Sequence, residues 1–337
     1  SSDDGKTFSE KVRVNSDSDM PSGINHAPSM SIGAKGELYV AWAGASGNGF
    51  ASDIKFSRSL DGGRTFEPSI TVNDDKVPAS HGFESMTIAP DGTIYLAWLD
   101  RREKKEGTSA TYFARSFDSG KTFEKNVRID VNSCPCCRTA VTSAPDGTVY
   151  VSWRKVFNPV PADSKQGGDV REIVAAKSSD RGISFSESSI VGNDNWVIAG
   201  CPHRGASLSA DKDGILYIVW YTEGGDGLPS IYIANSKDGG KNFTKNPLPY
   251  SKGTFPDHPV MALNKDGIPV ILWEETTPVL SRVMFQLKDE KPQQMNQGIR
   301  RSHDPVISVN KKGDILVVWS QEEMRFTKTA LRLFRGQ

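Results

Sequence analysis

Every histidine and every cysteine of the sequence lies a short, fixed distance before one of six repeated tryptophans. Positions 15 to 19 before these tryptophans hold all five histidines and all four cysteines. Imidazole and thiolate groups are the usual protein ligands of zinc, copper and iron. A structural repeat places equivalent residues side by side, so the spacing predicts one shared metal or redox site. The tryptophans are Trp42, Trp98, Trp153, Trp220, Trp273 and Trp319.

The predicted metal ligands come from several repeats. Several imidazoles with one or two soft sulfur atoms favour copper over zinc. No C-x-x-C-H motif is present, so covalently attached haem is not indicated. The ligands we expect first are His26, His81, Cys136, His203 and His303, with Cys137 and His258 as second choices.

Three other interpretations of the same residues stay open. Cys134 and Cys201 occupy equivalent positions of neighbouring repeats, which also allows a structural disulfide in an oxidising compartment. Cys136 and Cys137 are adjacent and are either joined as a vicinal disulfide or free. The histidines are alternatively polar residues that fill a channel and hydrogen-bond to one another and to water.

The elements that position these residues are predicted to be β-hairpins. The phrase APDGTIYLAW and five variants of it each place a glycine six residues before the tryptophan. Glycine adopts positive φ without steric cost, so Asp-Gly or Lys-Gly between apolar runs predicts a tight hairpin turn. The six turn glycines are Gly36, Gly92, Gly147, Gly214, Gly267 and Gly313.

A second phrase, S-x-D-x-G-x-[TSN]-F, follows four of the hairpins and also opens the chain. Its aspartates are Asp3, Asp61, Asp118, Asp180 and Asp238, and the fifth repeat carries QLKDEKPQQ in its place. Two hairpins per repeat predict an all-β, six-bladed β-propeller with four-stranded antiparallel blades in a single domain, residues 1–337. We expect the N-terminal strand, KVRVN, to close the last blade, with blades near 26–78, 81–131, 134–196, 201–250, 255–298 and 301–337 plus 1–18.

The second phrase resembles the Asp box of the sialidase-like propellers, and the cysteine motifs CPCC and CPH resemble uncharacterised bacterial members of that group. The resemblance implies the propeller fold strongly and sialidase activity weakly, because one fold serves many functions. Sialidases use three arginines, an aspartate acid/base and a tyrosine–glutamate pair. The F/Y-R-I-P motif expected in the first blade is replaced by Ile24–Pro28, so the catalytic set does not transfer residue by residue.

Candidate catalytic residues nevertheless follow the repeat tryptophans. Bidentate guanidinium groups suit an anionic ligand, and we expect Arg138 and Arg204 to bind one. The alternative for each charged residue is an ordinary solvated position at the rim. The catalytic candidates are Asp100, Arg102, Arg154, Tyr221 and Glu274.

Composition limits the classes of function. The chain has 41 basic and 41 acidic residues, so it lacks the concentrated positive charge that nucleic acids require. No apolar run is long enough to span a membrane. The sequence starts at Ser1 without methionine, and we expect a secreted or periplasmic protein whose signal peptide has been removed. Three functions remain: a copper propeller for redox chemistry or metal handling, with a periplasmic partner; a sialidase-type glycoside hydrolase; and a non-enzymatic binding propeller.

Overall fold

The computed structural model describes residues 3, 5–22, 27–46, 51–103, 108–157, 168–287, 290–296, 301–323 and 326–336. The chain forms two compact units, one of residues Lys11–Gly205 and one of Ser1–Glu10 with Ala206–Gln337. In the described residues the regular structure is β-strand apart from one short 3-10 helix, η1 (Asp17–Asp19). None of the described helical structure has the length and apolar character needed to cross a bilayer.

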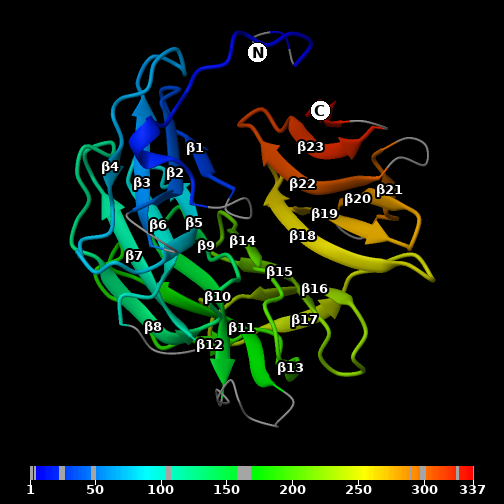
Figure 1. Ribbon diagram of the computed structural model, residues 1–337. Coiled ribbons are helices and arrows are strands. Elements are labelled where there is room, and N and C mark those ends of the chain that lie inside the picture. The colour runs from blue at the N-terminus through cyan, green and yellow to red at the C-terminus, as the bar shows by residue number, and fades with distance from the viewer. Residues whose placement is uncertain are drawn as a thin grey trace. The chain divides into compact units, whose positions relative to one another are not determined.

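The Lys11–Gly205 unit contains three groups of antiparallel strands, labelled in Figure 1. The first is the sheet β1 (Ser29–Ile32), β2 (Leu38–Ala45), β3 (Ser52–Ser59) and β4 (Ile70–Thr71). The second is β5 (His81–Ile88), β6 (Ile94–Asp100), β7 (Ser109–Ser116) and β8 (Val127–Ser133). The third is β9 (Ala140–Ser143), β10 (Val149–Phe157), β11 (Asp169–Ser178) and β12 (Ser189–Ile190), with β13 (Trp196–Ile198) paired to β11. The single pair Lys155–Ser133 joins the second group to the third.

The other unit holds three separate sheets. The first is β14 (Ser207–Ala210), β15 (Leu216–Thr222), β16 (Ser230–Ser236) and β17 (Thr244–Pro247). The second is β18 (Phe255–Leu263), β19 (Pro269–Thr276), β20 (Ser281–Leu287) and β21 (Gln293–Gln294). The third has three strands, β22 (Ser302–Val309), β23 (Ile315–Glu322) and β24 (Thr327–Phe334).

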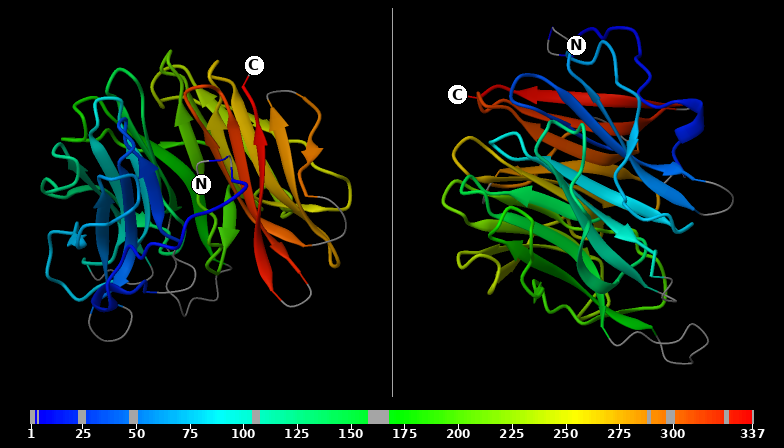
Figure 2. Two further views of the ribbon diagram at one scale, coloured as in Figure 1. Left: turned by 90° about the horizontal axis from the view of Figure 1, so that it is seen from above. Right: turned by 90° about the vertical axis from the view of Figure 1, so that its left-hand side faces the viewer.

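The strand expected to close the last blade is not formed in the structure. Residues 11–15 are mostly exposed and belong to no strand, because they share no backbone ladder with another segment. The preceding segment does lie against β24, since Gly5 packs against the Leu331 side chain, and Figure 2 shows this segment near the last strand. The all-β fold is established and the expected closing strand at residues 11–15 is not formed, whereas the number of blades stays a prediction.

The six hairpin turns form where the sequence places them. Each repeat glycine lies between the first two strands of its group, with φ between 77° and 91°. Left-handed backbone of this kind favours glycine over any residue with a Cβ atom. The tryptophan six residues later is buried in every repeat. Two hydrophobic clusters of the Lys11–Gly205 unit form between neighbouring strand groups.

The S-x-D-x-G phrases form tight turns between the third and fourth strands. In the turn after β7, Asp118 accepts hydrogen bonds from the Thr122 amide at 3.0 Å and the Thr122 hydroxyl at 2.7 Å, while Ser116 accepts one from the Gly120 amide at 2.9 Å. These bonds lower the pKa of Asp118 to about 2, against the opposing effect of its partial burial. The same arrangement recurs at Asp61, Asp180 and Asp238.

Candidate functional site

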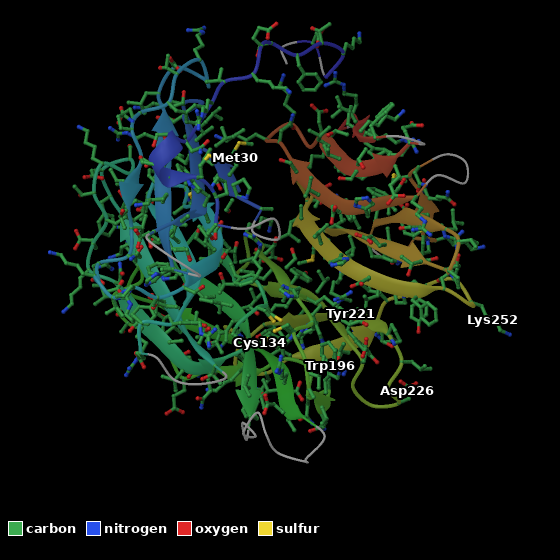
Figure 3. All side chains as sticks on the ribbon, in the orientation of Figure 1. Met30, Cys134, Trp196, Tyr221, Asp226 and Lys252 are labelled. Atoms are coloured by element: carbon green, nitrogen blue, oxygen red, sulfur yellow. The ribbon has the colours of Figure 1, made fainter. Side chains whose placement is uncertain are left out.

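Three cysteine thiols lie together in the segment between β8 and β9. The Sγ atoms of Cys134 and Cys136 are 3.7 Å apart, and those of Cys134 and Cys137 are 3.2 Å apart. All three side chains are buried, and Phe83 packs against them. Figure 3 shows sulfur atoms gathered at Cys134. The CPCC motif therefore folds into a compact cluster of thiols.

Positive charge lies beside this cluster. The Arg171 guanidinium on β11 approaches the Cys134 sulfur at 3.3 Å and donates a hydrogen bond to the Gly200 carbonyl at 2.5 Å. Side-chain hydrogen bonding with Cys136 and Cys137, with a contribution from the charge of Arg171, lowers the pKa of Cys134. Burial raises the pKa of Cys137 to about 12. Cys134 is therefore the thiol of the three that is most easily ionised.

The second cysteine motif brings Cys201 and His203 to the same place. One ligand atom each from Cys136, Cys201 and His203 lie within 4.8 Å of one another. Cys201 and His203 are exposed, whereas Cys136 is buried. The His203 ring packs 6.0 Å from the Phe83 ring, and its backbone has a left-handed φ of 55°. Cys136 is thus shared between a buried thiol cluster and an exposed triad.

All four cysteines are free thiols in the structure. The near neighbours of Cys134 are Cys136 and Cys137, and the sulfur near Cys201 is that of Cys136. The predicted pairing of Cys134 with Cys201, and the vicinal pairing of Cys136 with Cys137, are therefore not formed here.

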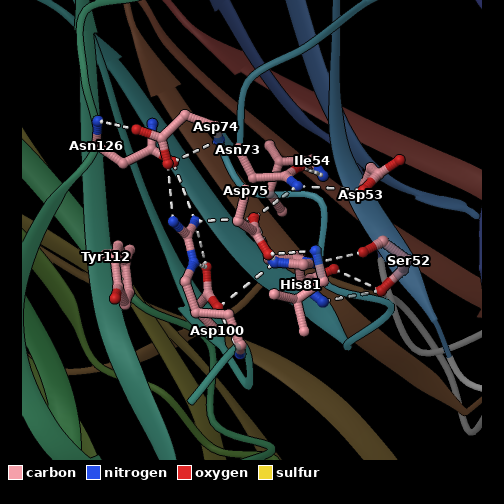
Figure 4. Close-up of polar contacts among 12 residues, drawn as sticks. Ser52, Asp53, Ile54, Asn73, Asp74, Asp75, His81, Asp100, Tyr112 and Asn126 are labelled. Atoms are coloured by element: carbon pink, nitrogen blue, oxygen red, sulfur yellow. Dashed lines mark hydrogen bonds and ion pairs between the residues drawn. The ribbon is translucent and has the colours of Figure 1, made fainter. Parts of the chain in front are cut away.

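His81 lies in a separate, carboxylate-rich group on β5, drawn in Figure 4. Its Nε2 atom is 3.2 Å from Asp75 and 3.4 Å from Asp100, and its Nδ1 atom is 2.5 Å from the Ser52 carbonyl oxygen. Among the described residues, the ligand groups do not join His81 to a cysteine. The sequence placed His81 beside Cys136, whereas the structure pairs it with aspartates.

Asp100 and Arg102, two of the catalytic candidates, are held in that same network. Asp100 accepts hydrogen bonds from the Trp98 indole at 2.8 Å and from the Arg102 Nε atom at 3.0 Å. Arg102 also pairs with Asp74 at 2.8 Å and stacks over the Tyr112 ring at 4.1 Å. Asp100 and Arg102 are therefore both engaged in polar contacts within this network, and their catalytic roles stay predictions.

Arg138 and Glu84 form a pair of a different kind. The Arg138 guanidinium donates to the backbone carbonyls of Glu84 and of Ala27, the latter at 2.6 Å, and its side chain is about a third exposed. The Glu84 carboxylate is fully buried, 3.8 Å from Arg138. Neither of its oxygen atoms has a hydrogen-bond partner among the described residues. Burial raises the pKa of Glu84 to about 7, although Arg138 opposes the shift.

Arg154 and Arg204 are tied to the loop that carries Cys201 and His203. Arg154 is buried, donates to the Arg204 carbonyl at 3.2 Å and lies over the Trp196 ring at 4.7 Å. The Arg204 side chain donates to the Pro202 carbonyl. Gly205 packs directly on the Arg138 backbone, where a Cβ atom would overlap it. Arg138 and Arg204, the two arginines expected to bind an anion, therefore lie on backbone segments that pack against each other.

The remaining candidates lie in the Ala206–Gln337 unit. His258 is 3.4 Å from Glu274, which accepts a hydrogen bond from the Asp304 amide at 2.7 Å. His303 contacts the Asp304 carboxylate at 2.6 Å through Nδ1. Tyr221 donates a hydrogen bond to Glu223. His26 lies outside the described residues.

Sequence reasoning missed Glu84 and Arg171. The available signal for Glu84 is that it is the one acidic residue in the strand HGFESMTI. Arg171 lies on the third strand of its group, outside the positions that the repeat singled out.

No family model matches the sequence, and no curated protein matches it. Solved structures do resemble it. A protein of unknown function from Dyadobacter fermentans is 16% identical over 97% of both chains, with a TM-score of 0.63. An α-L-arabinofuranosidase from Fusarium graminearum is 12% identical over 94% of this chain and 97% of that one, with a TM-score of 0.62. A leech intramolecular trans-sialidase is 11% identical over 98% of this chain and 70% of that one, with a TM-score of 0.59.

At these identities the likeness defines the fold alone: this is an all-β chain with the β-propeller type of fold that sialidases and arabinanases share.

Proposed function

We propose that the chain is a sialidase-type glycoside hydrolase that acts on an anionic sugar. The names of its structural neighbours, which include a trans-sialidase and an arabinofuranosidase, support this choice of reaction over metal redox chemistry. Membership of the Asp-box group is part of the proposal, as is secretion to the periplasm or the outside of the cell. The S-x-D-x-G turns described above support that membership.

The observation that carries the proposal is the pairing of Arg138 with Glu84. The Arg138 guanidinium is hydrogen-bonded to two backbone carbonyls and about a third exposed, so it offers a positive charge at the surface to an anionic group. A carboxyl with a pKa of about 7 holds a proton near neutral pH, which a general acid needs. Hydrolysis then transfers that proton to the leaving glycosidic oxygen as the glycosidic bond breaks. Water adds to the anomeric carbon, and the proton that this water loses restores the neutral Glu84 carboxyl.

Glu84 is covered in this structure, so the proposal includes one movement. The anionic group of the substrate draws the Arg138 guanidinium outward and uncovers the carboxyl behind it. Arg204 lies next in the backbone to Gly205, which packs on Arg138, and gives a second positive group for the same anion.

Release of a fluorophore from glycosides of sialic acid and of glucuronic acid tests this function, with a neutral arabinofuranoside for comparison. We expect Glu84→Gln to lower kcat at least 100-fold, the usual contribution of a general acid. Arg138→Met should raise KM about tenfold or more for the anionic glycosides. The matched control is Arg128→Met, because Arg128 is a surface arginine paired with Glu103.

A chelator should leave the rate unchanged. Binding of the anionic glycosides without release of product would show a non-enzymatic binding module and contradict the proposal. Equal activity of the parent chain and Glu84→Gln would contradict the role of Glu84.

A further inference from the structure

We propose that Cys136, Cys201 and His203 form a binding site for copper(I). This site is independent of the proposed hydrolase and uses none of its catalytic groups. Cys136 and His203 are among the ligands that the sequence predicts, and Cys201 is a predicted disulfide partner. His81, another predicted ligand, does not belong to the site.

The spacing of the three ligand atoms carries the inference. They lie within 4.8 Å of one another and converge from two segments that are about 65 residues apart in the sequence. Metal–sulfur bonds of about 2.3 Å in a three-coordinate site would put ligand atoms about 4 Å apart. The free chain therefore holds the three groups close to the separation that one bound ion requires.

The chemistry of the ligand set selects the ion. Two thiolates and one imidazole are soft donors, which copper(I) and zinc prefer over hard cations. Structural zinc sites take four protein ligands in a tetrahedron, whereas this triad offers three. We therefore assign copper(I), with the buried thiol of Cys134, 3.7 Å from Cys136, as a neighbour of the bound sulfur.

The surroundings hold the ligands in place and leave a path for the ion. Arg171 bonds to the Gly200 carbonyl beside Cys201, and Arg154 bonds to the Arg204 carbonyl beside His203. The same Arg171 lies 3.3 Å from the Cys134 sulfur, where its charge offsets negative charge on the thiols. Cys201 and His203 are exposed, so the ion reaches the site directly from solvent.

Competition for copper(I) tests the site in the reduced full-length chain, purified without a histidine tag. Bathocuproine disulfonate serves as the competing chelator under anaerobic conditions. We expect one copper(I) per chain, with affinity at least tenfold lower in Cys201→Ser and in His203→Ala. Both residues are exposed, so these changes should leave the fold intact, which circular dichroism verifies. X-ray absorption should show two sulfur atoms and one nitrogen at the metal.

His303→Ala is the control, because it removes an imidazole without touching the triad. It should retain the parent affinity. The assignment is overturned if the chelator removes all copper, if Cys201→Ser and His203→Ala bind as the parent does, or if His303→Ala weakens binding equally. Stoichiometric zinc that excludes copper would also overturn it, as would a Cys136–Cys201 disulfide that persists in reductant.

The two proposals fail separately. Loss of copper binding leaves glycoside hydrolysis untouched, and an inactive hydrolase leaves the copper affinity unchanged.

Discussion

Asp100 and Glu84 are buried carboxylates of the same unit that differ in their hydrogen-bond partners. Asp100 receives hydrogen bonds from an indole and a guanidinium, and these partners satisfy its charge. Glu84 has an arginine at 3.8 Å and no hydrogen bond to either oxygen among the described residues. Burial without compensation favours the neutral form, and this raises the pKa of Glu84.

The raised pKa of Glu84 predicts a pH-dependent loss of stability. The folded chain holds this proton up to about pH 7, whereas the unfolded chain releases it near the ordinary value of 4.5. The Glu84 carboxyl therefore makes its full contribution to the free energy of unfolding below pH 4.5. This contribution falls as the pH rises and is lost once the pH passes 7. Between pH 4.5 and 8 the parent chain should lose about 3 kcal/mol relative to Glu84→Gln.

Urea unfolding of both chains at the two pH values measures this difference. Glu84→Gln serves as the reference for the parent chain, because every other titrating group is common to both chains. Parallel pH profiles for the parent chain and Glu84→Gln would show that Glu84 stays ionised when buried.

At the scale of the elements, glycine has two distinct functions. Gly92 in the hairpin between β5 and β6 and Gly120 in the turn after β7 both have left-handed backbone, with φ of 87° and 80°. A Cβ atom on Gly92 would meet nothing within 4 Å, whereas one on Gly120 would overlap the buried Phe56 ring of the neighbouring sheet. Gly120 therefore allows both the left-handed backbone of the turn and the close contact between the two sheets.

Alanine substitutions should separate these functions. Gly92→Ala should cost about 1 kcal/mol of unfolding free energy, the strain of a Cβ atom at positive φ. Gly120→Ala should cost about 1–3 kcal/mol more, because the Phe56 ring must move within a packed core. Urea midpoints of the two variants give the comparison, and similar midpoints would mean that the ring relocates freely.

The hairpins could be predicted because their signal is local. A glycine that lies between apolar runs, six residues before a tryptophan, predicts both the turn and the two strands that flank it. The positions of the imidazoles could not be predicted so well. At the starts of β5, β18 and β22 a bulge shifts the register, with left-handed backbone at Phe83, His258 and Asp304. Counting residues from the tryptophan does not reveal such a bulge, so equivalent positions do not point their side chains alike.

For the whole chain, the repeat predicted which segments resemble each other but not which side chains meet. Ligand atoms of Cys136, Cys201 and His203 lie within 4.8 Å of one another, although the sequence assigned Cys201 to a disulfide and not to the ligand set. His81 does not join them, because Asp75 and Asp100 surround it. Glu84, and with it the pairing of Glu84 with Arg138, became visible only through burial, which depends on packing between segments far apart in sequence.

The first ten residues belong to the same unit as the C-terminal strands, which leads to a prediction for truncation. Deletion of residues 1–10 removes the packing of Gly5 on Leu331 and exposes that side chain of β24. Hydrogen exchange should become faster at the β24 amides, with a stability loss of about 1 kcal/mol for the newly exposed apolar surface. Exchange in β2 should not change, and unaltered exchange in β24 would contradict the role of the segment.

The bulges at the starts of β5, β18 and β22 have a consequence for how this molecule can diversify. Each bulge lies between two paired stretches of the same hairpin, and it separates the register of the short stretch before it from that of the longer stretch after it. An insertion or exchange upstream of a bulge thus leaves the pairing of the hairpin in register. Segments transplanted from a relative at these three points should bring their own ligand preference while the host scaffold continues to fold.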